Sequence, residues 1–550
     1  FGKEGSEGID GDLVFSYTLG ARSPKRALRG KYGNRGAAPS SMPQDGSKNH
    51  RGKTLDDLIQ AIKANSLAVD LEVIRQAYEF AKSAHAEQRR LSGEPYLEHP
   101  LQTAITLAEM KLDQSTIVAA LLHDVTEDTG CPSEKIERQF GPEVATLVAG
   151  TTKLSKLKYR GIERYAENLR KMFVAMAEDV RVVLIKMADR LHNLRTIEAL
   201  PPEKQHRIAL EVLELFAPIA NRLGIGQLKG ELEDLAFPIA YPDEWRWFSQ
   251  HIIPHYRRRV EELGAVIDEI KKILAAAKIK SADVHGRTKH YYSLYRKLLL
   301  PQYNRNINEI YDIVAIRVIV PNLDECYKAM GVIHTRFTPL PGRIKDYIAQ
   351  PKPNRYQSLH TTVFADGGRI VEVQIRDPKM HDQAEYGIAA HWHYKEMGKN
   401  FWSRLSRLPG FHHRGYVMPR RLKWIQELAS WQREISDTNQ FLRRLKIDAF
   451  KDRIFVFTPN GDVIDLPDEA TPVDFAYYIH TDIGNTCVGA KINGKLESLS
   501  VQLRNGDVVE IITDRSRKFP NRDWLRFART EVARSKIRAA LRTSEFSLAG

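Results

Sequence analysis

The sequence predicts a multidomain protein in which an all-α domain precedes an α/β domain and a small β-rich domain. Three observations support this organisation. The chain has 550 residues, which is too long for a single hydrophobic core. Apolar residues recur at three- and four-residue spacing from about residue 54 to 240, as in helices that face a core. After that point β-branched stretches such as "EIYDIVAIRVIV" become frequent, which is typical of strands.

The composition is that of an ordinary globular protein, with 42% hydrophobic and 28% charged residues. No signal peptide or membrane-spanning apolar run is visible, so we expect no membrane association. The three cysteines, Cys131, Cys326 and Cys487, lack CxxC spacing, which argues against a disulfide framework and favours a cytoplasmic location. The net charge of +14 favours polyanionic partners such as nucleotides or RNA.

These changes in pattern predict five segments. In chain order we expect a disordered extension at 1–53, a helical domain with connecting helices at 54–240, an α/β domain with a C-terminal helix at 241–450, a β-rich domain at 451–514, and the start of a truncated helical region at 515–550. "TTVFADGGRIVEVQIR" predicts two strands around an Asp-Gly-Gly turn, and "RIFVFTPNGDVIDLP" predicts a hairpin with an Asn-Gly turn. The basic segment at 399–421 has no assignment.

In the helical domain, "LLHDVTEDTG" (121–130) places four ionisable side chains directly after an apolar run. In a helix, His123 and Glu127 lie one turn apart, and so do Asp124 and Asp128. Two imidazoles and two carboxylates could then form a metal site from His99, His123, Asp124 and Asp189. Such a mixed site suits manganese, iron or zinc better than magnesium, and Glu127 and Asp128 would position and deprotonate a water. An acidic helix cap with core histidines is the alternative for "HD" alone, but the spaced set favours a metal site.

Two further stretches are rich in hydrogen-bond donors. If "GRTKHYYSLYRK" (286–297) is helical, His290, Ser293 and Lys297 share one face and could follow a polyphosphate. A solvated basic helix face is the alternative. "PGRIKDYIAQPKPNRYQSLHTT" (341–362) reads as a proline-punctuated loop. There a tyrosine could stack on a base while cations meet phosphates.

The strand "IVEVQIR" supplies an acidic side chain, Glu372, on the face opposite its apolar residues. Asp312 could complete a carboxylate pair, in which one member holds Mg²⁺ and the other takes a proton from a sugar hydroxyl. A solvent-facing polar stripe is the alternative for this strand. Strict alternation does not place Asp312 and Arg317 on one face, so their relative position stays open.

The strings "SGEPYLEHP", "LLHDVTEDT" and "ADRLHNLRT" resemble the HD-type hydrolase domain of the RelA/SpoT family. The resemblance implies an all-α domain that uses Mn²⁺ to remove the 3′-pyrophosphate from (p)ppGpp. It also implies that Arg90 stacks on the guanine and that Asn193 and Thr196 line the nucleotide pocket. Leu91 departs from the family, which often has a basic residue at that position.

The donor-rich stretches are similar to the nucleotidyltransferase-like synthetase domain of the same family, which transfers pyrophosphate from ATP to the 3′-hydroxyl of GDP or GTP. The resemblance implies that Arg287 and Arg317 sandwich adenine and that Tyr356 stacks on guanine. Asp312 would bind Mg²⁺, with Glu372 as the base or a second metal contact. Phosphates and ribose would be held by Lys289, Ser293, Lys297, Lys345, Lys352, Asn354, His360 and Gln374, and the same stretches add His290, Arg343 and Gln357 as nucleotide-binding candidates.

"PVDFAYYIHTDIGNTCVGAKINGKL" (472–496) is similar to the β-grasp TGS domain, which in this family contacts uncharged tRNA on the ribosome. His480 would lie near the tRNA end, and a capped surface histidine is the alternative. The resemblance therefore implies a bifunctional stringent-response enzyme of the Rel type, truncated after this domain. Two alternatives stay open: a hydrolase-dominant enzyme with a silent or allosteric synthetase site, and a non-catalytic ribosome- or RNA-binding factor. The sequence leaves the oligomeric state open.

Overall fold

The computed structural model describes residues 52–67, 69–155, 161–279, 282–301, 303–310, 312–351, 356–366, 368–390, 453–504, 506–514, 516–517 and 519–548. The expected disordered extension, apart from its last two residues, lies outside this part, as do the basic segment at 399–421 and the candidate residues Lys352 and Asn354. Among the described helices, none is both long enough and apolar enough to cross a bilayer.

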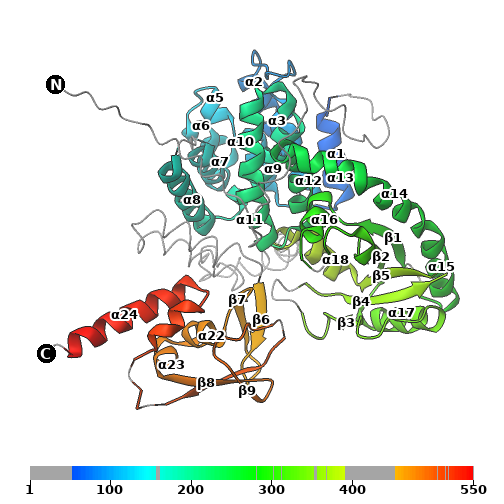
Figure 1. Cartoon of the computed structure of the whole chain (residues 1–550). Coiled ribbons are helices and arrows are strands. Elements are labelled where there is room, and N and C mark those ends of the chain that lie inside the picture. Colours follow the sequence, from blue (N-terminus) through cyan, green and yellow to red (C-terminus); the bar gives the residue numbers. More distant parts are fainter. Residues whose placement is uncertain are drawn as a thin grey trace, which may run out of the picture. The chain divides into compact units, whose positions relative to one another are not determined.

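The first part of the described chain is helical, as the apolar spacing predicts (Figure 1). In chain order its helices are α1 (Leu55–Ala64), α2 (Leu71–Ala84), α3 (Glu98–Glu109), α4 (Gln114–Leu122), α5 (Val125–Asp128), α6 (Ser133–Phe140), α7 (Pro142–Ser155), α8 (Gly161–Glu178), α9 (Arg181–Arg195), α10 (Pro202–Glu211), a π-helical turn (Val212–Phe216), α11 (Ala217–Arg222) and α12 (Gly226–Ala240). Helix α3 packs on α1, α4 and α9, and α4 also packs on α2 and α7. Polar side chains such as His99 on α3 and Asp189 on α9 therefore lie inside the domain, where they need partners.

The helix predicted across "LLHDVTEDTG" is interrupted. Helix α4 begins at the N-cap Asp113, whose carboxylate accepts from the Thr116 backbone N–H, and it ends at Leu122. His123 is its C-cap and Asp124 is the N-cap of the short helix α5. The chain thus bends at the His-Asp pair, which turns both side chains into the interior.

Three helices connect the helical part to a five-stranded mixed sheet: α13 (Pro242–His251), α14 (Ile253–Glu261) and α15 (Leu263–Ala276). The strands are β1 (Asp283–Thr288), β2 (Val314–Ile319), β3 (Lys345–Asp346), β4 (Leu359–Ala365) and β5 (Arg369–Arg376), in the order β1-β2-β5-β4-β3. Strands β2 and β5 are parallel and the other pairs are antiparallel. The predicted β4–β5 hairpin is confirmed.

Helices cover the sheet and link it to the helical part. Helices α15 and α17 (Leu323–Arg336) pack on each other and on the strands, as Figure 1 shows. Helix α16 (Tyr291–Leu298) packs on α12, and α18 (Pro378–Tyr386) packs on both α12 and β5. Helix α12 therefore meets two helices that border the sheet.

The strand register lines up polar residues in a row across four strands. Lys345 is paired with His360, His360 with Gln374, and Gln374 with Arg317. Residues opposite one another in neighbouring strands point to the same face of a sheet. Arg287 and Glu372 are both paired with Ala315, two residues along from Arg317, so they share that face.

Two local predictions need correction. Residues 286–288 are not helical, because β1 pairs with β2 over Asp283–Thr288, and α16 begins only at Tyr291. Residues 341–362 are not a loop throughout, because β3 lies within them and β4 begins at Leu359. In both cases pairing with a strand distant in sequence decides the conformation, which a local pattern does not reveal.

The last part of the described chain is β-rich, as predicted. It contains β6 (Arg453–Phe457), β7 (Val463–Pro467), α22 (Pro472–Ile479), α23 (Thr481–Thr486), β8 (Cys487–Ile492), β9 (Lys495–Glu497), β10 (Val509–Thr513) and α24 (Glu531–Leu548). Strands β6 and β7 form the predicted hairpin, with Gly461 at a φ of +87° in its turn. Strands β10, β8 and β9 form a second sheet, and α22 packs against β7, β8 and β10.

Candidate functional site

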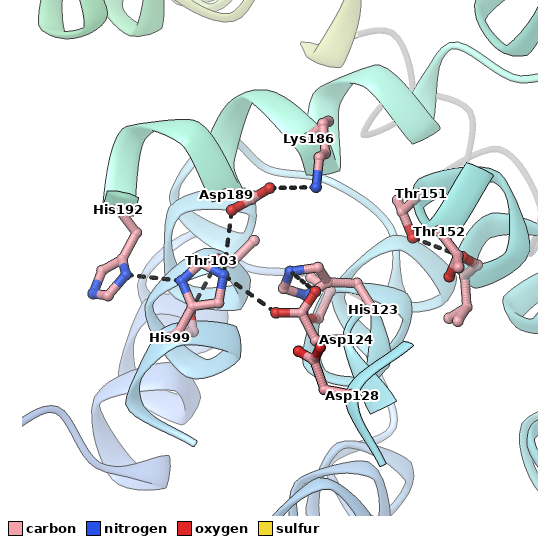
Figure 2. A network of polar contacts seen from close by, with 12 residues as sticks. His99, Thr103, His123, Asp124, Asp128, Thr151, Thr152, Lys186, Asp189 and His192 are labelled. Atoms are coloured by element: carbon pink, nitrogen blue, oxygen red, sulfur yellow. Dashed lines mark hydrogen bonds and ion pairs between the residues drawn. The ribbon is translucent and has the colours of Figure 1, made fainter. Parts of the chain in front are cut away.

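A buried group of histidine and aspartate side chains lies where α3, α4 and α5 meet (Figure 2). One ligand atom from each of His99, His123 and Asp124 lies within 4.8 Å of the others. The three residues are 3%, 1% and 9% exposed, respectively. The structure therefore brings together three of the four ligands that the sequence predicts.

The donor chemistry of His123 fits a cation. Its Nδ1 lies 2.8 Å from the carbonyl oxygen of Ala120, which can only accept, so Nδ1 carries the ring proton. The lone pair is then on Nε2, which is buried, has no hydrogen-bond partner among the described residues and lies 3.1 Å from Asp124 Oδ1. Two acceptors facing each other at this distance repel unless a positive charge lies beside them.

Asp189, the fourth predicted ligand, lies beside this group on α9. Its Oδ1 is 3.3 Å from His99 Nε2, which is itself 3.5 Å from Asp124 Oδ2. Its Oδ2 is 2.6 Å from Lys186 Nζ. Although burial disfavours the charged carboxylate, Lys186 holds the pKa of Asp189 well below its usual value. Burial also lowers the pKa of His99, which favours the neutral ring that metals bind.

The two acidic residues of α5 lie at the edge of the group. Glu127 and Asp128 are exposed. The hydroxyl of Tyr96 lies 3.1 Å from Asp124 Oδ2 and 2.5 Å from Asp128 Oδ2. Tyr96 thus connects a predicted metal ligand to a predicted water-positioning residue, a role that the sequence did not reveal. Its ring stacks on that of His85, with centroids 4.6 Å apart.

The predicted nucleotide residues of the helical domain adjoin the same group. The Arg90 guanidinium donates to Asn193 Oδ1 at 2.6 Å, and Asn193 Nδ2 donates to Asp189 Oδ1 at 2.5 Å. Thr196 is the C-cap of α9, and its hydroxyl donates to the His192 carbonyl. Leu91 is 79% exposed next to Arg90. Arg90 and Asn193 therefore lie next to the ionisable group, and Asn193 is in direct contact with Asp189.

A second polar group involves residues of the five-stranded sheet and the segment before β2. Asp312 precedes β2, so the alternation of side chains along the strand does not apply to it. The alternation therefore does not prevent Asp312 and Arg317 from facing the same side. The Asp312 carboxylate lies 2.8 Å from Lys289 Nζ and 2.6 Å from Lys297 Nζ. Burial raises the pKa of Asp312, but the two lysines outweigh this and lower it to about 2. Two predicted phosphate ligands thus pair with the predicted metal ligand.

A chain of hydrogen bonds crosses the sheet face. Glu372 Oε1 lies 2.8 Å from His360 Nδ1, and His360 Nε2 lies 2.8 Å from the Tyr356 hydroxyl. Arg287 donates to Gln374 Oε1 at 3.3 Å. Burial opposes ionisation of Glu372, yet the hydrogen bond and charge of His360 bring its pKa below the usual value. The predicted base is therefore linked to the predicted guanine-stacking ring through one histidine.

Arg376 and Glu385 belong to this network although the sequence did not single them out. Arg376 is 0% exposed and donates to Tyr356 Oη at 2.8 Å and to Gln374 Oε1 at 3.0 Å. Glu385 on α18 accepts from Arg317 at 2.7 Å and from Arg376 at 3.5 Å. The solvent-facing stripe considered for β5 is wrong, because Gln374 and Arg376 are buried. The signal that the sequence offered for Arg376 was an arginine at the end of the strand "IVEVQIR".

The remaining predicted nucleotide- and tRNA-binding residues lie outside these two polar groups. His290 Nδ1 lies 2.9 Å from Asp234 Oδ2, and Ser293 donates to Glu233, so both contact α12. The remaining described candidates are Arg343 and Lys345, which are exposed, and Gln357, which donates to the Ile348 carbonyl. His480 is exposed and is the N-cap of α23, where its side chain accepts from the Asp482 backbone N–H.

Three family models match the chain: the HD domain at residues 77–226, the region found in RelA / SpoT proteins at 286–399, and the TGS domain at 454–513. Relatives include the GTP pyrophosphokinase of Streptomyces coelicolor, 47% identical over 492 residues that cover 88% of this chain and 58% of that protein. The GTP pyrophosphokinase of Myxococcus xanthus is 46% identical over 86% of this chain and 61% of that protein. The chain therefore spans less than two thirds of the length of both relatives.

The bifunctional (p)ppGpp synthase/hydrolase SpoT of Escherichia coli is 45% identical over 491 residues, which cover 89% of this chain and 67% of that protein. Among solved structures, small alarmone synthetase 1 from Bacillus subtilis bound to pppGpp aligns with 34% of this chain and 96% of its own, at 24% identity and a TM-score of 0.22. With 45% identity over two thirds of SpoT, and with a match to the region found in RelA / SpoT proteins, this chain belongs to the RelA/SpoT family.

Proposed function

We propose that this protein is a bifunctional alarmone enzyme with two separate active sites. One site would transfer pyrophosphate from ATP to the 3′-hydroxyl of GDP or GTP, and the other would hydrolyse the resulting (p)ppGpp to GDP or GTP and pyrophosphate. The observation that carries this proposal is that two distinct groups of paired ionisable residues exist, one buried on α3–α5 and α9 and the other partly buried at the sheet face. A protein that only binds RNA needs neither group.

The hydrolase site would comprise His99, His123, Asp124 and Asp189 around Mn²⁺. The lone pair of His123 beside the Asp124 carboxylate supports a cation there. When bound, the ion would lower the pKa of a water and polarise the 3′-pyrophosphate. Asp128 and Glu127 would orient that water and accept its proton as its oxygen bonds to the phosphorus next to the ribose. The bond from this phosphorus to the 3′-oxygen would break, and the 3′-oxygen would leave as a hydroxyl after taking up a proton. Arg90, Asn193 and Thr196 would hold the nucleoside.

The synthetase site would use Glu372 as the base that takes the proton from the 3′-hydroxyl of the guanosine nucleotide. The freed oxygen would attack the β-phosphate of ATP, and AMP would leave. Asp312 would hold Mg²⁺, which neutralises phosphate charge during such a transfer. This requires Lys289 and Lys297 to turn from Asp312 toward the phosphates. Their ion pairs with Asp312 support a site that exchanges one charged partner for another.

The segment boundaries, the partners and the location belong to the same proposal. We propose a hydrolase domain at 54–240, a synthetase domain at 241–450 and a TGS domain at 451–514, with uncharged tRNA and the ribosome as partners through the last. The exposed imidazole of His480 would face tRNA. All three cysteines are free thiols, which supports a cytoplasmic enzyme.

Chromatography of guanine nucleotides tests both activities in one mixture. The protein would receive ATP, GDP, Mg²⁺ and Mn²⁺, alongside Asp124→Ala and Glu372→Gln variants. We expect Asp124→Ala to accumulate guanosine carrying a 3′-pyrophosphate, because synthesis continues without hydrolysis. Glu372→Gln should make no such product but should still hydrolyse added ppGpp.

Each alternative gives a different result in this assay. A hydrolase with a silent synthetase site would consume ppGpp yet make none even as Asp124→Ala. A non-catalytic RNA-binding factor would change no nucleotide and would bind RNA with a steep salt dependence. Equal product from the parent and Asp124→Ala would contradict the assignment of the α4–α5 group to hydrolysis.

A further inference from the structure

The side chains of Arg90, His192 and His99 form a chain of contacts that leads into the buried metal-binding group. Arg90 Nη1 lies 2.9 Å from His192 Nδ1, and His192 Nδ1 lies 2.9 Å from His99 Nδ1. Figure 2 shows the His192 ring beside that of His99, at the side away from Asp189 and Asp124. His192 and His99 are 5% and 3% exposed, so solvent has little access to either side chain.

The positions of the ring protons follow from the chemistry of arginine. A guanidinium has only donors, so His192 Nδ1, which faces Arg90 Nη1, must present a lone pair. The same lone pair faces His99 Nδ1, which must therefore carry a proton and donate. A neutral imidazole has one ring proton, and hence His99 Nε2 is left with its lone pair. That atom faces the oxygens of Asp124 and Asp189.

We infer that His192 is a positioning residue for the metal: by accepting from His99 Nδ1 it fixes the ring orientation and the tautomer in which His99 Nε2 binds the ion. Metal-binding histidines generally donate their second nitrogen to such a partner, which fixes the ring and raises its basicity. The usual partner is a carboxylate, carbonyl or water. Here it is a second histidine, whose own tautomer is set by Arg90.

The surroundings offer His99 Nδ1 no other recorded partner among the described residues. Asp124 and Asp189 lie on the Nε2 side of the ring, and Thr103 donates to the His99 backbone carbonyl rather than to the ring. Asn193 makes a parallel link, since it accepts from Arg90 and donates to Asp189. Arg90 is therefore connected to two metal-binding side chains, through His192 to one and through Asn193 to the other.

Metal affinity, measured without substrate, tests the inference. Metal-free protein would be titrated with Mn²⁺, and free Mn²⁺ would be followed by electron paramagnetic resonance. His192→Asn keeps an acceptor oxygen near the Nδ1 position, whereas His192→Gln places its oxygen near the Nε2 position. We expect His192→Gln to bind Mn²⁺ about 10–100-fold more weakly than the parent, as when such a partner is lost. His192→Asn should remain within about threefold of the parent, because it retains the hydrogen bond.

The control is His255→Gln, which makes the same chemical change at an exposed position on α14. Circular dichroism of each variant verifies that it is folded. Parent-like Mn²⁺ affinity in His192→Gln would overturn the inference, and so would an equal loss in His192→Asn and His192→Gln. The inference rests on the metal site of the proposed hydrolase, and the two fail differently. A parent that binds no Mn²⁺ removes both, whereas a parent that binds it with no effect of His192→Gln removes only the role of His192.

Discussion

Tyr96 carries a single hydroxyl that serves two acidic residues of different predicted roles, Asp124 and Asp128. The hydroxyl has one proton, which it cannot donate fully to both carboxylates at once. Both carboxylates therefore lie close to one hydroxyl, and their negative charges repel each other. A metal ion on Asp124 would reduce that repulsion and leave the proton to Asp128. Tyr96 would then fix Asp128, the carboxylate that we propose orients the attacking water.

Replacing Tyr96 by phenylalanine should therefore slow hydrolysis of ppGpp by roughly 10–100-fold, the usual effect of removing an outer partner in a metal site. The kcat for pyrophosphate release would be measured at saturating Mn²⁺, so that a change in metal affinity does not contribute. Tyr78→Phe deletes the same atom from α2 at a position outside the group and serves as the control. A Tyr96→Phe enzyme as fast as the parent would show that the hydroxyl has no part in the reaction.

The residues missed by sequence analysis share one property: their roles depend on burial and on partners far away in the chain. His99, His123, Asp124 and Asp189 are recognisable because their spacing is unusual and their chemistry is that of metal ligands. Tyr96, His192 and Arg376 lie within stretches that the sequence singles out, but their own residue types suggest no role there, and only folding places each against a predicted site residue. Sequence reasoning therefore finds the reactive groups more readily than the groups that hold them.

Among secondary-structure elements, periodicity predicted those that are decided locally. The helices of 54–240 and the two hairpins follow from apolar spacing and from turn residues. The strand β1 was missed because "DVHGRT" has little β-forming character of its own. It becomes a strand by pairing with β2, which follows it in the chain after helix α16. Arg287 consequently lies on the sheet face, where it meets Gln374.

Helix α18 is held at its end by a close contact with the helical part. Gly387 follows it with a φ of +52°, and a Cβ built there would lie 2.4 Å from the carbonyl oxygen of Leu223. That same carbonyl accepts from the Ile388 backbone N–H at 3.0 Å. A side chain at this position would strain the backbone and displace α18, which carries Glu385 between two arginines of the sheet.

We therefore expect Gly387→Ala to destabilise the protein by about 1–3 kcal/mol beyond the cost of the φ angle alone. Gly368→Ala is the comparison, because Gly368 also has a positive φ, of +72°, but a Cβ there would meet nothing within 4 Å. Urea denaturation followed by circular dichroism measures both variants. If the two alanine variants unfolded at the same urea concentration, the close approach of Gly387 to the Leu223 carbonyl would add no cost of its own.

For the whole molecule, the two predicted sites are built on different elements but are not isolated from each other. Helix α12 contacts α9 of the helical part and also α16, where Lys229 and Glu233 both reach Ser293. Lys111, which follows α3, pairs with Asp382 on α18 at 2.9 Å. A change in either site therefore has a physical route to the other, whereas the predicted reacting groups of each site come from separate elements.

Metal binding should stabilise the molecule only through the helical part. An ion that binds the folded protein alone adds about 2.7 kcal/mol when its concentration is 100 times the dissociation constant. We expect Mn²⁺ to raise the unfolding temperature of the parent in calorimetry, and excess chelator to reverse the shift. Asp124→Ala should show no such shift, because it lacks a carboxylate of the buried group.

Beside the sheet, Asp312 is already neutralised by Lys289 and Lys297, so it offers Mn²⁺ little attraction until nucleotide phosphates draw the lysines away. An equal rise in the unfolding temperature of Asp124→Ala would mean that the ion binds elsewhere, and would contradict the proposal that the α3–α5 group is the metal centre.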